Sequence, residues 1–170
     1  TTIKSLSGIL VPSSGEVKVM GRTPWEHRIE TVSQLGVVFG QKTQLWWDLP
    51  VIESFSLLKE IYAVPDAAYK KTLGELTDAL SLSNLFDMPV RQLSLGQKMR
   101  CEIAASLLHQ PKILFLDEPT IGLDAVSKLA VRDFIKHLNR DKKVTILLTT
   151  HDMDDIESLC QRVLLLNEGK

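Results

Sequence analysis

The stretch Ile113-Leu114-Phe115-Leu116-Asp117-Glu118-Pro119 decides the fold class of this 170-residue chain. Its four apolar residues predict a strand that is buried on both faces, as strands of parallel sheets are. Two adjacent acids stand at the carboxyl end of this strand, where open α/β sheets bind ligands, and Pro119 ends the strand. One carboxylate could hold Mg²⁺ through its water shell, and the other could polarise an attacking water. A strand that ends in two solvated acids is the alternative interpretation.

Strands and helices alternate around this stretch, which predicts an α/β fold with a mostly parallel sheet. We expect further strands at Glu16–Met20, Leu35–Phe39, Val144–Thr149 and Val163–Leu166. Helical periodicity predicts helices within residues 50–85, with a break at Pro65, and over residues 96–109, 125–138 and 153–159. Because the helical stretch 42–110 falls between two strands, we interpret it as a subdomain inserted into a core formed by residues 1–41 and 111–170.

A second motif, Leu93-Ser94-Leu95-Gly96-Gln97, opens the helix expected near residue 96. Ser94 is suited to the N-cap position, and Gly96 would let the backbone approach a ligand closely. The start of the helix would direct backbone N–H groups and a positive dipole end toward an anion. From the pentapeptide alone, a simple capped helix is the more economical interpretation.

Two polar residues follow expected strands. His151 could donate a hydrogen bond to a phosphate oxygen, and Gln41 could ligate Mg²⁺ through its amide oxygen. A capping histidine and an ordinary loop glutamine are the alternatives. The helix expected after His151 would carry favourable negative charge in its first turn, from Asp152, Asp154 and Asp155.

Charge and composition narrow the possible functions. The formal net charge of -1 argues against a general nucleic-acid surface, so we expect no nucleic-acid partner. No apolar run approaches the roughly 18 residues that span a bilayer. Cys101 and Cys160 have no CxxC partner, which favours free thiols over a disulfide or a metal site.

Taken together, the motifs resemble the ATP-binding cassette (ABC) family of ATPases in order and spacing. Its pattern is a glutamine after a strand, LSLGQ at a helix start, ILFLDEP, then Gly122-Leu123-Asp124, and a strand before His151. The resemblance covers the whole chain and implies a P-loop NTPase-like fold that binds ATP and Mg²⁺. It also implies that Asp117 lies near Mg²⁺, that Glu118 is the catalytic base and that His151 holds the γ-phosphate.

The resemblance implies protein partners as well. Gln41 resembles the glutamine that contacts Mg²⁺ and faces the membrane subunits, and Asp124 resembles the aspartate that crosses the interface between two ATPase domains. Ser94, Gly96 and Gln97 resemble the signature loop, which binds the γ-phosphate of ATP held by the partner domain. The expected partners are therefore transmembrane permease subunits and a second ABC ATPase domain, identical or closely related, at the cytoplasmic face of the membrane.

Two features depart from the family pattern. Leu95 stands where most of the family has glycine; this variation, and residues 38–50, resemble a branch of drug- and antibiotic-resistance exporters. The phosphate loop GxxxxGK(S/T), or Walker A loop, does not occur in the sequence. Residues 1–10 resemble the helix that follows that loop, which would place Thr1 at the α-phosphate. We therefore expect a fragment of a longer protein, inactive by itself.

The leading hypothesis is the ATP-hydrolysing subunit of an ABC transporter, on the export side more than the import side. A soluble ABC ATPase of DNA repair or translation is a second hypothesis, although the sequence has no long coiled-coil insertion of the repair type. A catalytically dead remnant is a third.

Overall fold

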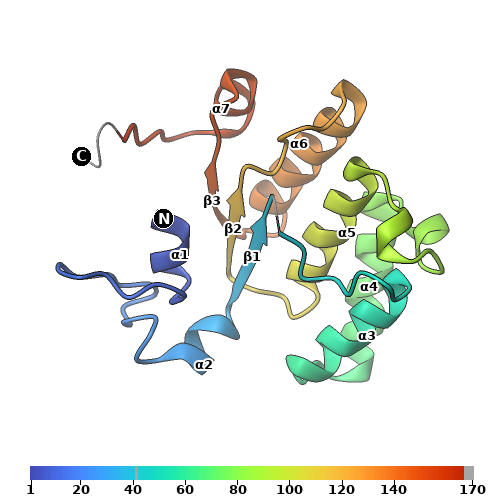
Figure 1. Ribbon diagram of the computed structural model, residues 1–170, viewed down its shortest axis with the longest axis horizontal. Helices are drawn as coiled ribbons and strands as arrows, with labels where there is room; N and C mark the ends of the chain where they lie inside the picture. The colour runs from blue at the N-terminus through green and yellow to red at the C-terminus, as the bar shows by residue number, and fades with distance from the viewer. Residues whose placement is uncertain (41, 167–170) are drawn as a thin grey trace.

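The computed structural model describes residues 1–40 and 42–166 (Figure 1). Three strands form one parallel sheet in the order β1-β2-β3, which confirms the predicted α/β fold. In chain order the elements are α1 Thr2–Leu6, α2 Arg28–Val32, β1 Leu35–Phe39, α3 Val51–Ile61, α4 Asp66–Leu80, the 3₁₀ turns η1 Ser83–Leu85 and η2 Val90–Gln92, α5 Leu95–Leu107, β2 Ile113–Asp117, α6 Ala125–Arg140, β3 Thr145–Thr149 and α7 Met153–Leu159.

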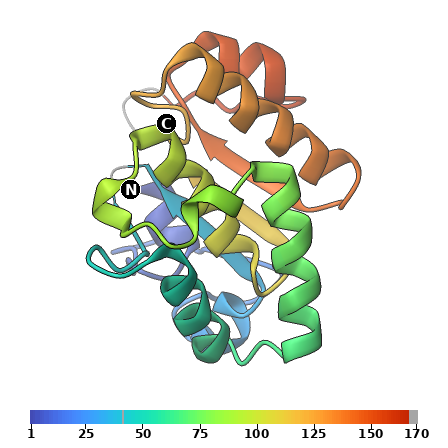
Figure 2. The ribbon, with the colours of Figure 1, turned by 90° about the vertical axis from the view of Figure 1, so that its right-hand side faces the viewer.

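Different helices cover the two faces of the sheet, because side chains of a strand alternate between its faces. Leu35 of β1 and Phe115 of β2 pack with Ile3 of α1 in a small apolar cluster. Val38 and Leu114 belong to the large cluster on the opposite face, together with residues of α3, α4 and α5. Figures 1 and 2 show α1 on one side of the sheet and α3, α4 and α5 on the other.

Helix α5 is fixed tightly to the sheet. Its apolar stripe, Met99, Ile103 and Leu107, is buried. A Cβ atom at Gly36 of β1 would lie 2.6 Å from the carbonyl oxygen of Ser106, so only glycine permits this close approach. The position of the last turn of α5 is therefore set by the sheet.

The helical stretch between β1 and β2 divides as its prolines predict. The stretch 50–85 separates into α3 and α4, and Pro65 is the N-cap residue of α4. The helices expected near residues 96, 125 and 153 correspond to α5, α6 and α7. Within the described residues, no helix has the length and apolar character needed to cross a membrane.

Two expected strands are wrong for the described part of the chain. Glu16–Met20 forms no strand; a single bridge pairs Val19 with Arg22 across a tight turn. Val163–Leu166 forms no strand either, and its apolar side chains are exposed. A strand needs a neighbour for its backbone N–H and C=O groups, and no other described segment pairs with either of these.

Candidate functional site

Asp117, one of the sequence-predicted residues, lies at the carboxyl edge of the sheet. In the parallel register, Phe39 of β1, Asp117 of β2 and Thr149 of β3 are aligned, so the loops that follow the strands emerge side by side. The hydroxyl of Thr149 donates a 2.6 Å hydrogen bond to Oδ1 of Asp117. This bond fixes the Asp117 carboxylate at the edge of the sheet.

Glu118 and His151 meet at this edge. The backbone N–H of Glu118 donates to the carbonyl of Thr149 at 3.0 Å, and its side-chain Oε2 lies 2.9 Å from Nδ1 of His151. Glu118 has φ 55°, an uncommon value for a residue with a side chain, so the backbone turns sharply just where the strand ends. Two chemically active side chains that follow different strands, β2 and β3, are thereby placed in direct contact.

The contact changes the acid–base behaviour of His151. The hydrogen bond that the imidazole donates to Glu118 and the charge of that carboxylate raise the pKa of His151 above its usual value, against the opposing effect of burial. The imidazole side chain is 74% exposed, so a ligand at the sheet edge could reach it. His151 is therefore a readily protonated donor beside a carboxylate.

A glycine makes room for the acids at this edge. The N–H of Gly40 donates to the carbonyl of Asp117 at 2.8 Å. A Cβ at Gly40 would lie 2.6 Å and 2.8 Å from the carbonyl oxygens of Glu118 and Asp117, a clash with backbone that cannot move away. The next residue, Gln41, which the sequence assigns to Mg²⁺ and to the membrane interface, lies outside the described residues.

A buried carboxylate, which the sequence analysis missed, holds the loops beyond β2 and β3 together. Asp155 of α7 is fully buried. Its Oδ2 accepts hydrogen bonds from Thr120 and, at 3.1 Å, from Thr150, while Oδ1 accepts from Nε of Arg132 at 2.6 Å. Thr120 lies two residues after Glu118, and Thr150 directly precedes His151, so Asp155 fixes the backbone on both sides of that pair.

The sequence predicts for Asp155 only favourable charge at a helix start, and the residue that caps this helix is Asp152. Asp152 is the N-cap of α7 and accepts from the N–H of Asp154 at 3.0 Å. The sequence does show a threonine near each of the two catalytic candidates, Thr120 near Glu118 and Thr150 next to His151. It does not show that both hydroxyl groups bond to Asp155.

The start of α5 forms the second group of sequence-predicted residues. Ser94 is the N-cap, as expected, and it forms a capping box with Gln97: the N–H of Gln97 donates to Oγ of Ser94 at 3.2 Å, and the N–H of Ser94 donates to Oε1 of Gln97 at 2.8 Å. A capping box fixes the entry of a helix. The backbone N–H groups in the first turn are then held in a rigid array.

Close packing joins the start of α5 to the start of α6. A Cβ at Gly96 would lie 2.4 Å from Oγ of Ser127. Asp124 is the N-cap of α6 and accepts from the N–H of Ser127 at 3.0 Å and from its hydroxyl at 2.6 Å; these bonds lower the pKa of Asp124. Ser94, Gly96, Gln97 and Asp124 are thus gathered at one junction of two helices.

Leu95, the departure from the family pattern, occupies a defined place at this junction. Its side chain is 46% exposed, and its Cδ2 lies 2.9 Å from where a Cβ of Gly122 would be. Gly122 has φ 70°, so glycine is favoured there by both backbone conformation and space. The larger side chain at position 95 therefore packs over a glycine in the loop before α6.

Thr1 stands apart from both groups. It is exposed and is the N-cap of the five-residue helix α1, without a side-chain capping bond. Among the described residues, no hydrogen bond or ion pair links it to Asp117, Glu118 or His151. Its expected contact with an α-phosphate remains a prediction.

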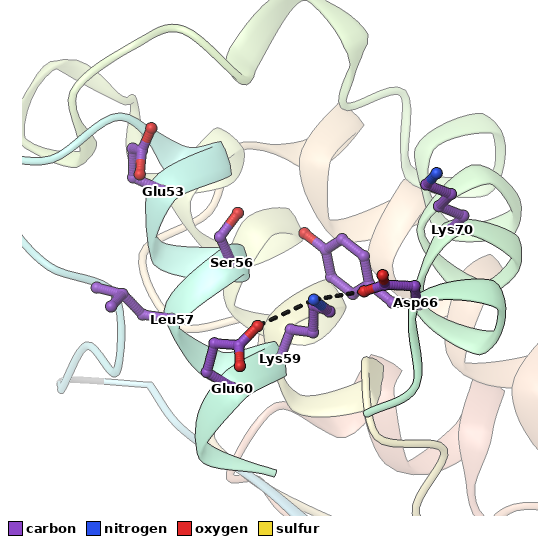
Figure 3. Close-up of a pocket in the computed structure, with 8 residues that line it drawn as sticks. Glu53, Ser56, Leu57, Lys59, Glu60, Asp66 and Lys70 are labelled. Carbon is purple, nitrogen blue, oxygen red and sulfur yellow. Dashed lines mark hydrogen bonds and ion pairs between the residues drawn. The ribbon is translucent and has the colours of Figure 1, made fainter. Parts of the chain in front are cut away.

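A shallow cleft of about 340 Å³ between α3 and α4 is separate from these groups (Figure 3). Two lysines, Lys59 and Lys70, line it. Lys59 is paired with Glu60 at 2.9 Å and with Asp66 at 2.6 Å, and it lies 5.9 Å from the ring centre of Tyr69. The hydrogen bonds that Lys59 donates to the two acids raise its pKa, the bond to Asp66 most. The charge of Lys59 is therefore already balanced by two carboxylates.

The side chains at the sheet edge offer too few oxygen ligands to hold Mg²⁺ unless a bound substrate supplies others. Within residues 1–40 and 42–166, no cluster of three or more His, Cys, Asp or Glu side chains could enclose a metal ion. Asp117 offers one oriented carboxylate, and Mg²⁺ is commonly held by one or two carboxylates, waters and substrate phosphates. The residues at the edge therefore fit a cation that arrives with a nucleotide.

Comparisons with known proteins identify the family to which the chain is similar. A family model described as ABC transporter matches residues 1–121. The chain is 36% identical to the probable multidrug ABC transporter ATP-binding protein YbhF of Escherichia coli, over 100% of this chain and 29% of YbhF. It is 34% identical to the methionine import ATP-binding protein MetN of Geobacillus kaustophilus, over 100% of this chain and 51% of MetN. The chain thus spans less than a third of one relative and about half of the other.

A solved structure is similar across most of the chain. The dimeric structure of a post-hydrolysis state of the ATP-binding cassette MJ0796, bound to ADP and Pi, gives a TM-score of 0.77 at 26% identity, and the match covers 91% of this chain and 70% of that one.

Proposed function

The chain belongs to the ABC transporter family, and on that premise we propose that it is the ATP-binding and hydrolysing domain of a membrane transporter. The observation that carries this proposal is the contact between Glu118 and His151 beside the Asp117 carboxylate at the carboxyl edge of the sheet. A base, a phosphate-facing donor and a cation-holding acid are the groups that hydrolysis of a nucleoside triphosphate needs at one place.

In this proposal each side chain has one task. Glu118 accepts a proton from the attacking water, whose oxygen bonds to the γ-phosphorus while the bond to the ADP oxygen breaks. His151 donates a hydrogen bond to a γ-phosphate oxygen, and its raised pKa favours the protonated form. Asp117, oriented by Thr149, would hold Mg²⁺ through water, and Gln41 would be a further ligand. Mg²⁺, when bound, offsets the negative charge of the phosphates.

We further propose that the γ-phosphate is bound from both sides by two ATPase domains. The start of α5, with Ser94, Gly96 and Gln97, supplies N–H donors to the nucleotide of the second domain, and Asp124 lies at the interface between the domains. The capping box and the positive end of the α5 dipole support this role. The dimeric arrangement of the similar MJ0796 cassette supports a paired domain.

The surface that follows β1 is our candidate for the contact with transmembrane permease subunits. Trp46 and Trp47 are 39% and 53% exposed, and large exposed aromatic side chains are frequent anchors of interfaces. The Trp47 ring is held by Lys98, whose Nζ lies 5.5 Å from the ring centre. In this arrangement residues 42–110 form the helical subdomain that meets the membrane partner at the cytoplasmic face, and residues 1–41 and 111–170 form the ATPase core.

Disulfide cross-linking tests this docking surface. A cysteine at Trp47 is expected to cross-link to a cytoplasmic loop of the membrane subunit in an active complex. A cysteine at Ile29, which is also exposed but lies on α2, is the matched control and is expected not to react. Cross-linking at position 29 but not at position 47 would contradict the assignment.

We propose export as the direction of transport. The pattern of residues 38–50, with Leu95 in the signature loop, resembles exporter-type members, and YbhF is described as a probable multidrug protein. MetN, described as an import protein, is nearly as similar, so direction needs its own test. Deletion of the gene should raise the accumulation of ethidium in cells if the transporter exports drugs; unchanged accumulation of ethidium and poorer growth on a limiting nutrient would favour import.

Hydrolysis itself is tested on the complete product of the gene. Purified with its membrane partner, it should release phosphate from Mg-ATP, and removal of Mg²⁺ with EDTA should stop the release. Absence of phosphate release, with the protein folded and ATP present, would refute the proposed activity.

A further inference from the structure

A carboxylate is buried in the middle of α5, away from the groups described above. Glu102 is only 3% exposed, and none of the ion pairs among the described residues includes it. Burial raises the pKa of Glu102, while hydrogen bonds from Thr43 and Gln44 and the charge of Lys98 oppose that rise. A buried acid is costly unless hydrogen bonds compensate it, so its partners are informative.

The partners of Glu102 come from the segment after β1. Oε1 accepts a short hydrogen bond from the hydroxyl of Thr43, and Oε2 accepts from the N–H of Gln44 at 3.3 Å. The side-chain amide of Gln44 donates to the backbone carbonyl of Glu102 at 3.1 Å. The next side chain, Leu45, is buried. Residues 43–48, which we call the 43–48 segment, are therefore attached to α5 at this point.

The same helix begins at the proposed phosphate-binding turn. Glu102 lies eight residues after Ser94, about two turns along one uninterrupted helix. The capping box holds the first turn, and the buried stripe holds the body of the helix to the sheet. Because the helix is continuous between these points, a displacement of the α5 start on binding phosphate would also displace Glu102.

The outer end of the 43–48 segment has other, exposed contacts with its surroundings. The carbonyl of Trp47 accepts from the N–H of Arg91 at 3.0 Å, and Asp48 pairs with the exposed Arg91 side chain at 2.7 Å. Water competes with exposed ion pairs, which contribute little. Lys98 of α5 also contacts the exposed ring of Trp47. The buried hydrogen bonds of Glu102 are the stronger link between α5 and this segment.

We propose that Glu102 is a positioning residue that transmits occupancy of the start of α5 to the 43–48 segment. The inference rests on the proposed function, because it assumes that a phosphate of ATP binds at residues 94–97 and that a membrane partner docks near Trp46 and Trp47. Glu102 itself touches neither ATP nor the partner. It determines whether the two surfaces respond together.

Hydrogen exchange measured by mass spectrometry on the complete gene product tests this link without a turnover assay. The probe is a nonhydrolysable ATP analogue with Mg²⁺. In the wild type, the analogue should slow exchange both in residues 93–98 and in the 43–48 segment. In Glu102→Ala, residues 93–98 should still respond, whereas the response of the 43–48 segment should fall about tenfold, as expected for loss of charge-assisted hydrogen bonds.

Two other variants separate the link from general destabilisation. Thr43→Val removes the hydroxyl donor from the segment and leaves α5 unchanged, so it should uncouple the two regions even if Glu102→Ala folds poorly. Ser106→Ala is the control. It removes a buried hydroxyl of α5 that donates to the carbonyl of Ile103 in the same helix at 2.7 Å. It should leave both responses as in the wild type.

The outcomes distinguish the inference from the proposed function. A 43–48 segment that responds to the analogue in Glu102→Ala and Thr43→Val as in the wild type would overturn the link, and so would a segment that does not respond in the wild type. No response of residues 93–98 in the wild type would instead contradict phosphate binding at α5. A segment that loses its response in Ser106→Ala as well would assign the effect to stability of α5 rather than to Glu102.

Discussion

The carboxyl edge of the sheet and the start of α5 are polar regions of opposite character in the same chain. The edge presents Asp117 and Glu118, which suit a cation and a proton. The start of α5 presents backbone N–H groups and a positive dipole end, which suit an anion. One region is assembled by the register of three strands and the other by a local capping box. Each supplies what the other lacks, which is why we propose that two domains complete one site.

The largest effect is expected for Glu118→Gln, which removes the base and preserves the shape of the side chain. ATP hydrolysis in the complete protein should fall by about a hundred- to ten-thousand-fold, the range for loss of general base catalysis, while ATP binding is kept. Phosphate release and calorimetric titration measure the two quantities. Glu157→Gln, on the exposed side of α7, is the control and should leave both unchanged. Full turnover in Glu118→Gln would show that the sheet edge does not supply the general base.

Ser94→Arg makes the corresponding test at the start of α5. The large side chain replaces the capping hydroxyl where phosphate is proposed to bind, so hydrolysis should fall by at least about a hundredfold, as for loss of a preorganised donor. Binding of ATP to a single domain should remain, because the sheet edge is untouched. Ser13→Arg, in an exposed loop, adds the same charge as a control. Loss of ATP binding in the Ser94→Arg monomer would indicate that the sheet edge and the α5 start of the same chain bind one ATP.

A methyl group added to each region sharpens the structural comparison. Gly40→Ala meets backbone carbonyls that cannot move, so it should lower the free energy of unfolding by about 3 kcal/mol, the upper end for overpacking. Gly96→Ala meets the side chain of Ser127 and gains helix propensity, so its net cost should be about 1 kcal/mol. Gly74→Ala in α4, with open space, is the control and should stabilise. Urea unfolding gives the three values; equal costs at positions 40 and 96 would contradict the comparison.

The smallest effect is a pKa change within the sheet edge. Because Glu118 raises the pKa of His151, the contact favours folding at pH below the ordinary histidine value, and this contribution is lost as pH rises through the raised value. In Glu118→Gln the pKa of His151 should fall toward its usual value. NMR titration of the imidazole measures it, with Glu157→Gln as the unchanged control. A pKa that does not move would mean that the contact does not persist in solution.

The two regions also differ in how far the sequence predicts them. The start of α5 was predictable because Ser94 and Gln97 form their capping box within one turn. Asp117 and Glu118 could be placed at a sheet edge because an apolar strand precedes them. The contact of Glu118 with His151, by contrast, depends on the register of β2 and β3, which no local pattern specifies.

Contacts between distant segments account for the features that local sequence patterns do not predict. Asp155 and Glu102 look like ordinary helix acids in the sequence, and only packing shows that they are buried and which loops they hold. The alternation in Glu16–Met20 and the apolar run Val163–Leu166 describe possible faces of strands, but pairing needs a second segment. Patterns along the chain therefore predict faces and caps, whereas contacts between distant segments must be observed.

The central claim, that the sheet edge of one domain works with the α5 start of another, is tested most directly by mixing two inactive variants. In a mixed dimer of Ser94→Arg and Glu118→Gln chains, one site combines an intact Glu118 with an intact Ser94, and the other site is doubly impaired. We expect equal mixing of the two variants to restore hydrolysis to about a quarter of the wild-type rate, since half of the dimers are mixed and each has one intact site of two. If the partner is a related chain, each variant is placed on a separate chain of the pair. A mixture as inactive as its components, with mixed dimers verified by mass, would contradict a site shared between two domains.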